Sequence, residues 1–191
     1  MNRRSCLTSL AALTTGSGCI GRALNQSSAN KMNKSISVSD VERRPPSEPE
    51  NLDADEKPAG IEFTVDIVSE SITPETTARI ALEYENASND ARTLNVNPDQ
   101  PGPISSVTES PGLVLLSDAQ DLSRQSSACW KPERDTFGRV RVGYQHSISP
   151  GDVETLKYDV WAAPQQDADC IEPGTYQFEP LYGSFTLTVR E

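Results

Sequence analysis

The distribution of apolar and polar residues divides the chain near residue 60. From there to the C-terminus, apolar residues alternate with polar ones in short runs, as in Ile61-Glu62-Phe63-Thr64-Val65. Alternation with a period of two is typical of antiparallel strands that bury one face. The pattern predicts short strands at 61–67, 78–84, 94–96, 113–116, 140–144, 156–160, 176–178 and 185–189.

Turn signals separate the predicted strands, and helical periodicity is nearly absent. One short helical turn is expected within 118–127. Pro-Gly pairs suit turns with Pro second and Gly third, and they occur at 101–102, 111–112, 150–151 and 173–174. We therefore predict an all-β domain over residues 60–191, built as an antiparallel β-sandwich of about seven to eight strands.

The first 18 residues have a different pattern. Arg3 and Arg4 precede a short apolar run at 7–13, and small residues then lead to Cys19. A basic start, a short apolar run and small residues before a cleavage point define a secretory signal. The run is too short and too polar to span the hydrocarbon core of a bilayer. Residues 1–18 are therefore predicted to be a signal peptide.

Two features of this segment resemble known export signals. The Arg3-Arg4 pair resembles a twin-arginine signal, which exports folded proteins. Gly16-Ser17-Gly18-Cys19 resembles a lipobox, whose Cys receives a lipid and becomes the mature N-terminus. The resemblance implies a lipid anchor on Cys19 that holds the protein at the outer face of the cell membrane. Cleavage near residue 19 without lipid attachment is the alternative.

Residues 19–59 are rich in Ser, Asn, Pro and charged side chains. Such a segment buries too little apolar surface to offset the entropy of ordering the chain. It is therefore predicted to be a flexible, acidic tether. Three Asn-x-Ser sequences, each a candidate N-glycosylation site, begin at Asn25, Asn33 and Asn86.

The charge balance excludes one class of partner. The chain carries 28 Asp and Glu against 17 Lys and Arg, for a formal charge of −11. This charge repels nucleic acid, so nucleic-acid binding is excluded. Only five of the basic residues are Lys, and an acid-rich, Lys-poor composition resembles that of proteins from extreme halophiles.

The cysteines predict one disulfide. Of the four cysteines, Cys6 leaves with the signal and Cys19 is consumed by the lipid. Cys129 and Cys170 remain, and disulfides persist in exported domains. A closed structural zinc site needs four ligands, which two cysteines and the single His146 do not supply. We predict a Cys129–Cys170 disulfide and neither metal nor cofactor.

Few residues suggest chemistry. His146-Ser147 is a conceivable base–nucleophile pair, but no Gly-x-Ser-x-Gly elbow is present, so no catalytic residue is assigned. Trp130 and Trp161 are candidate binding aromatics, because exposed rings on a β-sandwich contact sugars or proteins. Trp161 lies out of phase with Tyr158 and its alternating neighbours, so its ring should face away from theirs. The alternative is that both rings pack against the disulfide and the loops.

The segment Glu172-Pro173-Gly174-Thr175-Tyr176-Gln177-Phe178 resembles the turn, Gly and Tyr that open a late strand of immunoglobulin-like domains. Phe178 stands where antibody-type domains have a Cys, so their inter-sheet disulfide is missing. The whole chain resembles a haloarchaeal surface lipoprotein with an immunoglobulin-like domain. This implies a non-catalytic surface module that binds an unidentified protein or glycan. A structural envelope component and a hydrolytic surface enzyme are the alternatives.

Overall fold

The computed structural model describes residues 33–43, 60–107, 112–118, 122–127, 129–133, 137, 144–164 and 170–191. Within these ranges the protein is all-β, as predicted, and contains no helix. The strands are β1 (Lys34–Arg43), β2 (Ile61–Ser69), β3 (Ser71–Ile72), β4 (Arg79–Asn86), β5 (Arg92–Leu94), β6 (Ile104–Ser105), β7 (Leu113–Leu116), β8 (Arg124–Ser126), β9 (Cys129–Pro132), β10 (His146–Ile148), β11 (Val153–Ala162), β12 (Gly174–Phe178) and β13 (Gly183–Arg190).

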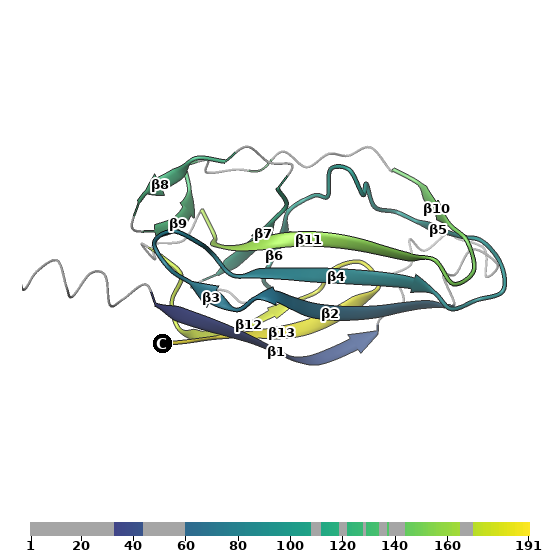
Figure 1. Ribbon diagram of the computed structural model, residues 1–191, viewed down its shortest axis with the longest axis horizontal. Coiled ribbons are helices and arrows are strands. Elements are labelled where there is room, and N and C mark those ends of the chain that lie inside the picture. Colours follow the sequence, from purple (N-terminus) through teal and green to yellow (C-terminus); the bar gives the residue numbers. More distant parts are fainter. Residues whose placement is uncertain are drawn as a thin grey trace, which may run out of the picture.

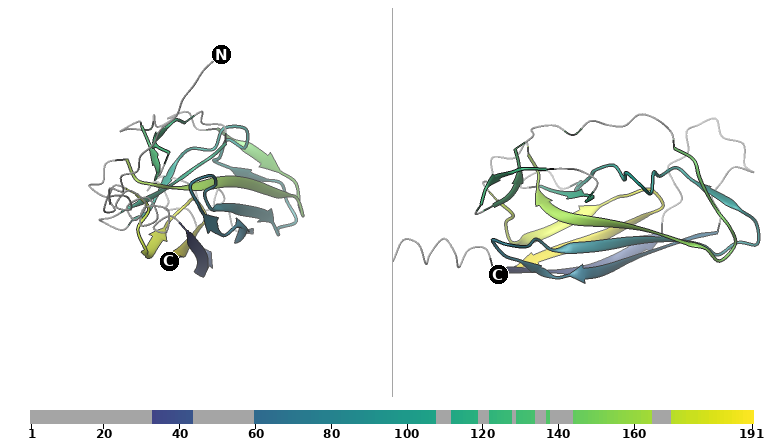
Figure 2. Two further views of the ribbon diagram at one scale, coloured as in Figure 1. Left: turned by 60° about the vertical axis from the view of Figure 1, so that its left-hand side comes forward. Right: turned by 45° about the horizontal axis from the view of Figure 1, so that its top comes forward.

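Two antiparallel sheets form the layers of a sandwich (Figure 1, Figure 2). The first has the strand order β2-β4-β11-β7-β6, and the second has the order β12-β13-β1-β3. In the first sheet β4 lies between β2 and β11, and its Leu82 pairs with Val65 on β2 and with Leu156 on β11. The hairpin β8–β9 and the pair β5–β10 form two smaller sheets.

Part of the strand order is the same as in a constant-type immunoglobulin sandwich. Strands β2, β4, β11 and β7 follow the order A, B, E, D of that fold, whereas β6 beside β7, and β1 and β3 beside β13, are additional to it. Ser106, which follows β6, forms a bridge with Phe178 on β12, and the Val107 N–H donates to the Gln177 carbonyl at 2.8 Å. The chain at 104–107 therefore passes from one sheet to the other, as strands do at the corners of sandwiches.

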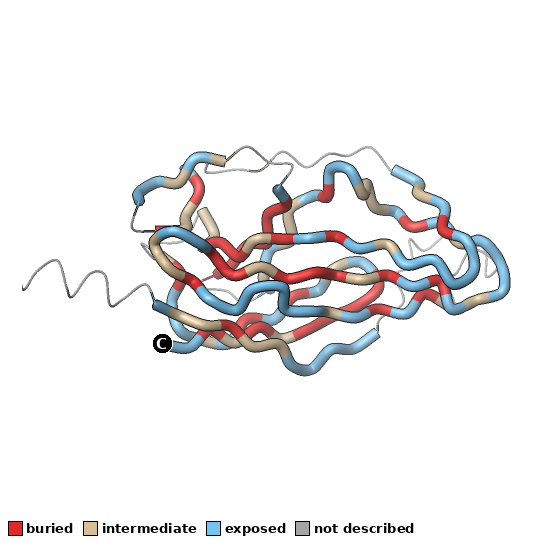
Figure 3. The backbone as a smooth tube through the Cα atoms, in the orientation of Figure 1, coloured by how far each residue is buried: buried red, intermediate tan, exposed pale blue. Residues whose placement is uncertain are grey.

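The core lies between the sheets, and the alternation along the strands fills it (Figure 3). On β11, Leu156, Tyr158 and Val160 are buried, whereas the intervening Lys157 is exposed. On the facing sheet, residues of β12 and β13 enter the same core cluster. The inward side chains are those that the period of two predicts, so the predicted sandwich is confirmed. The number of strands was underestimated, because the described residues form thirteen strands and not seven to eight; the additional ones are mostly short.

The folded domain begins earlier than we predicted. Residues 34–43, which we assigned to the tether, form β1 and pair along β13 from Ser35–Arg190 to Arg43–Gly183. A Ser-rich run reads as a linker, but Ile36 is buried and Val38 packs partly against the core. These two side chains share a face, and serines alternate with them. The register shifts between Ser39 and Glu42, where Asp40 has a φ of 50°.

Three local predictions have different outcomes. The helical turn expected within 118–127 is wrong over Arg124–Ser126, which form β8. There the chain pairs with β9 across a short hairpin. The strand predicted at 140–144 lies outside the described residues up to 143. The Pro150-Gly151 turn is confirmed, because both residues lie in a turn and Gly151 has a φ of 80°.

Candidate functional site at the two ends of the sandwich

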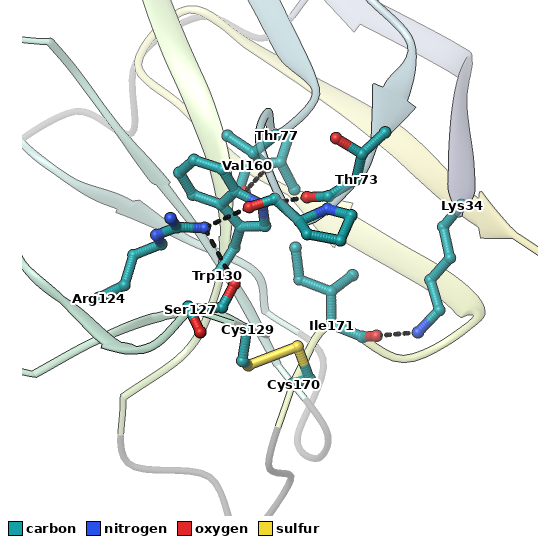
Figure 4. Close-up of a disulfide and its surroundings, with 11 residues drawn as sticks. Lys34, Thr73, Thr77, Arg124, Ser127, Cys129, Trp130, Val160, Cys170 and Ile171 are labelled. Atoms are coloured by element: carbon teal, nitrogen blue, oxygen red, sulfur yellow. Dashed lines mark hydrogen bonds between the residues drawn. A yellow bond between two sulfur atoms is a disulfide. The ribbon is translucent and has the colours of Figure 1, made fainter. Parts of the chain in front are cut away.

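At one end of the sandwich a disulfide joins two segments that are distant in sequence. Cys129 begins β9, and Cys170 precedes β12, with 5.3 Å between their Cα atoms (Figure 4). The predicted disulfide is thus confirmed. It fastens the β8–β9 hairpin to the segment that leads into β12. Cys129 is buried, whereas Cys170 is partly exposed.

The two tryptophans lie beside this disulfide. Trp161 is only 6% exposed and packs with Val114 and Leu116 on the outer face of the five-stranded sheet. It therefore faces away from Tyr158, as predicted. Trp130 is half-buried and meets Trp161 edge-on, with 5.1 Å between ring centroids. Trp161 is therefore not an exposed ring, whereas Trp130 keeps part of its surface exposed, and the alternative in which both rings pack beside the disulfide and the loops describes the pair.

Polar contacts reinforce the same end of the molecule. The Trp130 Nε1–H donates to the Thr73 carbonyl at 2.7 Å, and Nη1 of Arg124 donates to the Pro74 carbonyl at 2.6 Å. The Arg124 guanidinium also lies 4.3 Å from the centroid of the Trp130 ring, in the geometry of a cation–π contact. The Lys34 ammonium donates to the Ile171 carbonyl (Figure 4).

We name this region the staple end, comprising Lys34, residues 73–77, the described part of 122–133, and 170–172. Its donors are used to satisfy backbone carbonyls of neighbouring segments. Within the described residues, no buried side-chain nitrogen or oxygen lacks a hydrogen-bond partner. The arrangement therefore holds distant chain segments together.

The opposite end of the sandwich is organised around Asn86. This residue ends β4 and has no exposed surface. Its Nδ2 donates to the carbonyls of Asp90 and Ile148 at 2.8 and 3.0 Å, and its Oδ1 accepts from the N–H and O–H of Ser88. We name the loops 87–91 and 149–152 the loop end. A buried amide fixes both loops relative to the sheet.

These contacts correct one predicted modification site. A glycan is attached through Nδ2, and the Nδ2 of Asn86 is buried and donates both of its hydrogens to backbone carbonyls. The predicted glycosylation of Asn86 is therefore wrong for the folded domain. Asn33 is exposed immediately before β1, and its glycosylation stays a prediction. Asn25 lies outside the described residues. So do Arg3, Arg4, Cys19 and the rest of the signal at 1–18.

The single histidine lies near the loop end. His146 Nε2 is 2.9 Å from Glu154 Oε2, and the His side chain is partly exposed. Ser147 follows His146 within β10, so its side chain points to the other face of the strand. The geometry does not align this hydroxyl with the imidazole as a nucleophile. In the described ranges, no group of three or more His, Cys, Asp or Glu could hold a metal ion.

A charged cluster lies on the outer face of the five-stranded sheet. Arg79 Nε donates to Asp159 Oδ1 at 2.7 Å, and Arg79 Nη2 donates to Asp118 at 2.7 Å. The hydrogen bond to Asp159 is the main cause that raises the pKa of the Arg79 guanidinium. The cation is thus neutralised by two carboxylates, one from the neighbouring strand β11 and one from the turn that follows β7, and the cluster stabilises the sheet surface.

The part of the chain that the structure describes contains no helix long and apolar enough to cross a membrane. Compared with known proteins, the chain matches no protein-family model, no curated protein and no solved structure.

Proposed function

We propose that the protein is a non-catalytic surface module that binds a protein or glycan partner through its loop end. In this proposal the Arg3-Arg4 signal directs export, and a lipid on Cys19 anchors the mature chain to the outer face of the cell membrane. The observation that supports the proposal best is the contrast between the two ends of the sandwich. One end is tied together by covalent and polar contacts, whereas the other carries exposed loops on a rigid support.

The position of β1 suggests how the module is oriented. Lys34 lies at the staple end, where β1 begins and where the C-terminal strand β13 finishes (Figure 1). Only fifteen positions separate Lys34 from Cys19, and a coil of that length spans about 20 Å. A lipid on Cys19 would therefore hold the staple end toward the membrane and direct the loop end outward.

The loop end has the properties of a recognition surface. Binding residues occur frequently on loops that a rigid scaffold positions, and here buried Asn86 supplies that positioning. Asn89 and Asp90 are exposed in one loop, and Val153, which follows the other, is 51% exposed. An exposed amide, an exposed carboxylate and an exposed apolar side chain at this end suit a polar protein surface or the hydroxyl groups of a glycan.

Site-specific photocrosslinking in intact cells tests this proposal. A photoreactive amino acid would replace Asn89 at the loop end or, as the matched control, Glu75 at the staple end; both residues are exposed. We expect one discrete crosslinked product from position 89 and none from position 75. Crosslinks from both positions would instead indicate a structural envelope component that is contacted on all sides. Crosslinks only from position 75 would contradict the proposed orientation.

A further inference from the structure

The outer face of the five-stranded sheet carries a second, separate apolar cluster. Val114, Leu116 and Trp161 are buried there, although their neighbours Leu113 and Leu115 point into the main core. An outer sheet face of a sandwich ordinarily contacts solvent and is polar. In this molecule the β8–β9 hairpin lies over it and contributes Trp130. We name Val114, Leu116 and Trp161 the outer cluster.

The hairpin extends neither main sheet and is connected to the sandwich by its disulfide and by side chains. β8 and β9 pair with each other and not with a strand of either main sheet. Its polar connections to other segments include the bond from Trp130 to Thr73 and the bond from Arg124 to Pro74. Elements with few buried contacts open at a lower free energy than the core strands. The hairpin is therefore the kind of element that can detach locally.

The disulfide is the one covalent connection that opposes such detachment. It links Cys129 to Cys170, which precedes the buried Ile171 of the main core. The Ile171 carbonyl also accepts from Lys34 on β1. Cys170 is thus fixed to the sandwich, and the disulfide transfers that constraint to the hairpin.

We propose that the hairpin is a redox-controlled cover over the outer cluster. A dithiol reductant supplies the two electrons: one thiolate attacks the partly exposed Cys170 sulfur, forming a mixed disulfide and releasing the Cys129 thiolate. The second thiolate of the reductant then displaces Cys170, and the reductant leaves as a disulfide. Both cysteines take up protons, and the hairpin opens while the sandwich stays folded. This device operates whichever partner the loop end binds.

The natural fluorophores make this opening measurable. The chain contains two tryptophans, Trp130 on the hairpin and Trp161 on β11, and their rings touch where the hairpin meets the sheet. On reduction with dithiothreitol we expect their emission to shift to longer wavelength and a hydrophobic dye to bind several-fold more. Limited proteolysis should then cut within 122–133, while the far-ultraviolet circular dichroism of the sandwich is retained. Reoxidation should reverse all three changes.

Two results would overturn the proposal. If thiol titration shows both cysteines reduced but the tryptophan emission and dye binding are unchanged, the hairpin stays closed without its disulfide. If the circular dichroism is lost together with the tryptophan signal, the disulfide maintains the whole fold and not a local cover. The Cys129→Ser/Cys170→Ser variant should reproduce the reduced state. If that variant does not fold, reduction of the folded wild-type protein still distinguishes the outcomes.

Discussion

The ring of Phe63 on β2 lies against the backbone of Gly183 on β13 and occupies the space that a side chain at residue 183 would need. A Cβ built on Gly183 would lie 2.0 Å from Cδ1 of Phe63. We predict that Gly183→Ala destabilises the domain by about 1–3 kcal/mol, because a buried ring must move. Gly102→Ala is the matched control, since a Cβ there meets no atom within 4 Å. Denaturant unfolding of both variants measures the difference, and equal stabilities would contradict this packing.

A second prediction concerns the turn into β12. The Tyr176 hydroxyl donates to the Glu172 carbonyl at 2.8 Å, the contact of a tyrosine corner in immunoglobulin-like domains. Tyr176→Phe keeps the buried ring but removes this bond, so it should cost about 1 kcal/mol of unfolding free energy. Tyr144→Phe, at an exposed tyrosine, is the control and should change stability by less than about 0.5 kcal/mol. A Tyr176→Phe domain as stable as the wild type would show that the corner contributes nothing.

The main strands were predictable because each carries a strong local pattern. Alternation along β2, β4 and β11 identified which side chains enter the core. The phase of Trp161 along β11 placed its ring on the opposite face, as observed. The disulfide was predicted by setting aside Cys6 in the predicted signal and Cys19 at the predicted lipid site, which leaves Cys129 and Cys170. These features depend on neighbouring residues or on composition, and one sequence is enough to read them.

The features that were missed depend on contacts between distant segments. β1 has only Ile36 and Val38 as buried or partly buried apolar residues, and its pairing with β13 comes from the far end of the chain. Asn86 matched a glycosylation sequence. Only the folded loops show that its Nδ2 donates hydrogen bonds to the backbone carbonyls of Asp90 and Ile148. The β8–β9 hairpin shows no alternation of apolar and polar residues. It is attached to the sandwich by the disulfide and by Trp130, and not by backbone hydrogen bonds to a strand of a main sheet.

Stability should decrease at alkaline pH. Burial is the main cause that raises the pKa of Tyr84, Tyr158, Tyr176 and Tyr182 above the ordinary tyrosine value. The unfolded chain then releases protons near pH 10 that the folded chain still holds. The stability from these groups is therefore complete below about pH 10 and is lost as the pH rises further. Absorbance at tyrosinate wavelengths should rise together with the loss of circular dichroism. Titration of all tyrosines near pH 10 with the fold intact would contradict their burial.

Stability should also depend on salt. Removal of the predicted signal, with Arg3 and Arg4, would reduce the Lys plus Arg count from 17 to 15 against 28 acidic residues, which would change the charge from −11 to −13. Salt at about 1 M shortens the Debye length to about 3 Å and screens this repulsion. The melting temperature should therefore rise steeply between dilute buffer and about 2 M KCl. An unchanged melting temperature would argue against adaptation to high salt.

The proposed surface module is tested most directly by the intact mass of the protein extracted from membranes under non-reducing conditions. The mass should equal that of residues 19–191 plus a lipid on Cys19, less two hydrogens for the Cys129–Cys170 disulfide, with any glycan on Asn33 added to it. Cys19→Ser should remove the lipid increment and release the protein from the membrane. An unmodified N-terminus at any other residue, in protein that fractionates away from the membrane, would contradict the account.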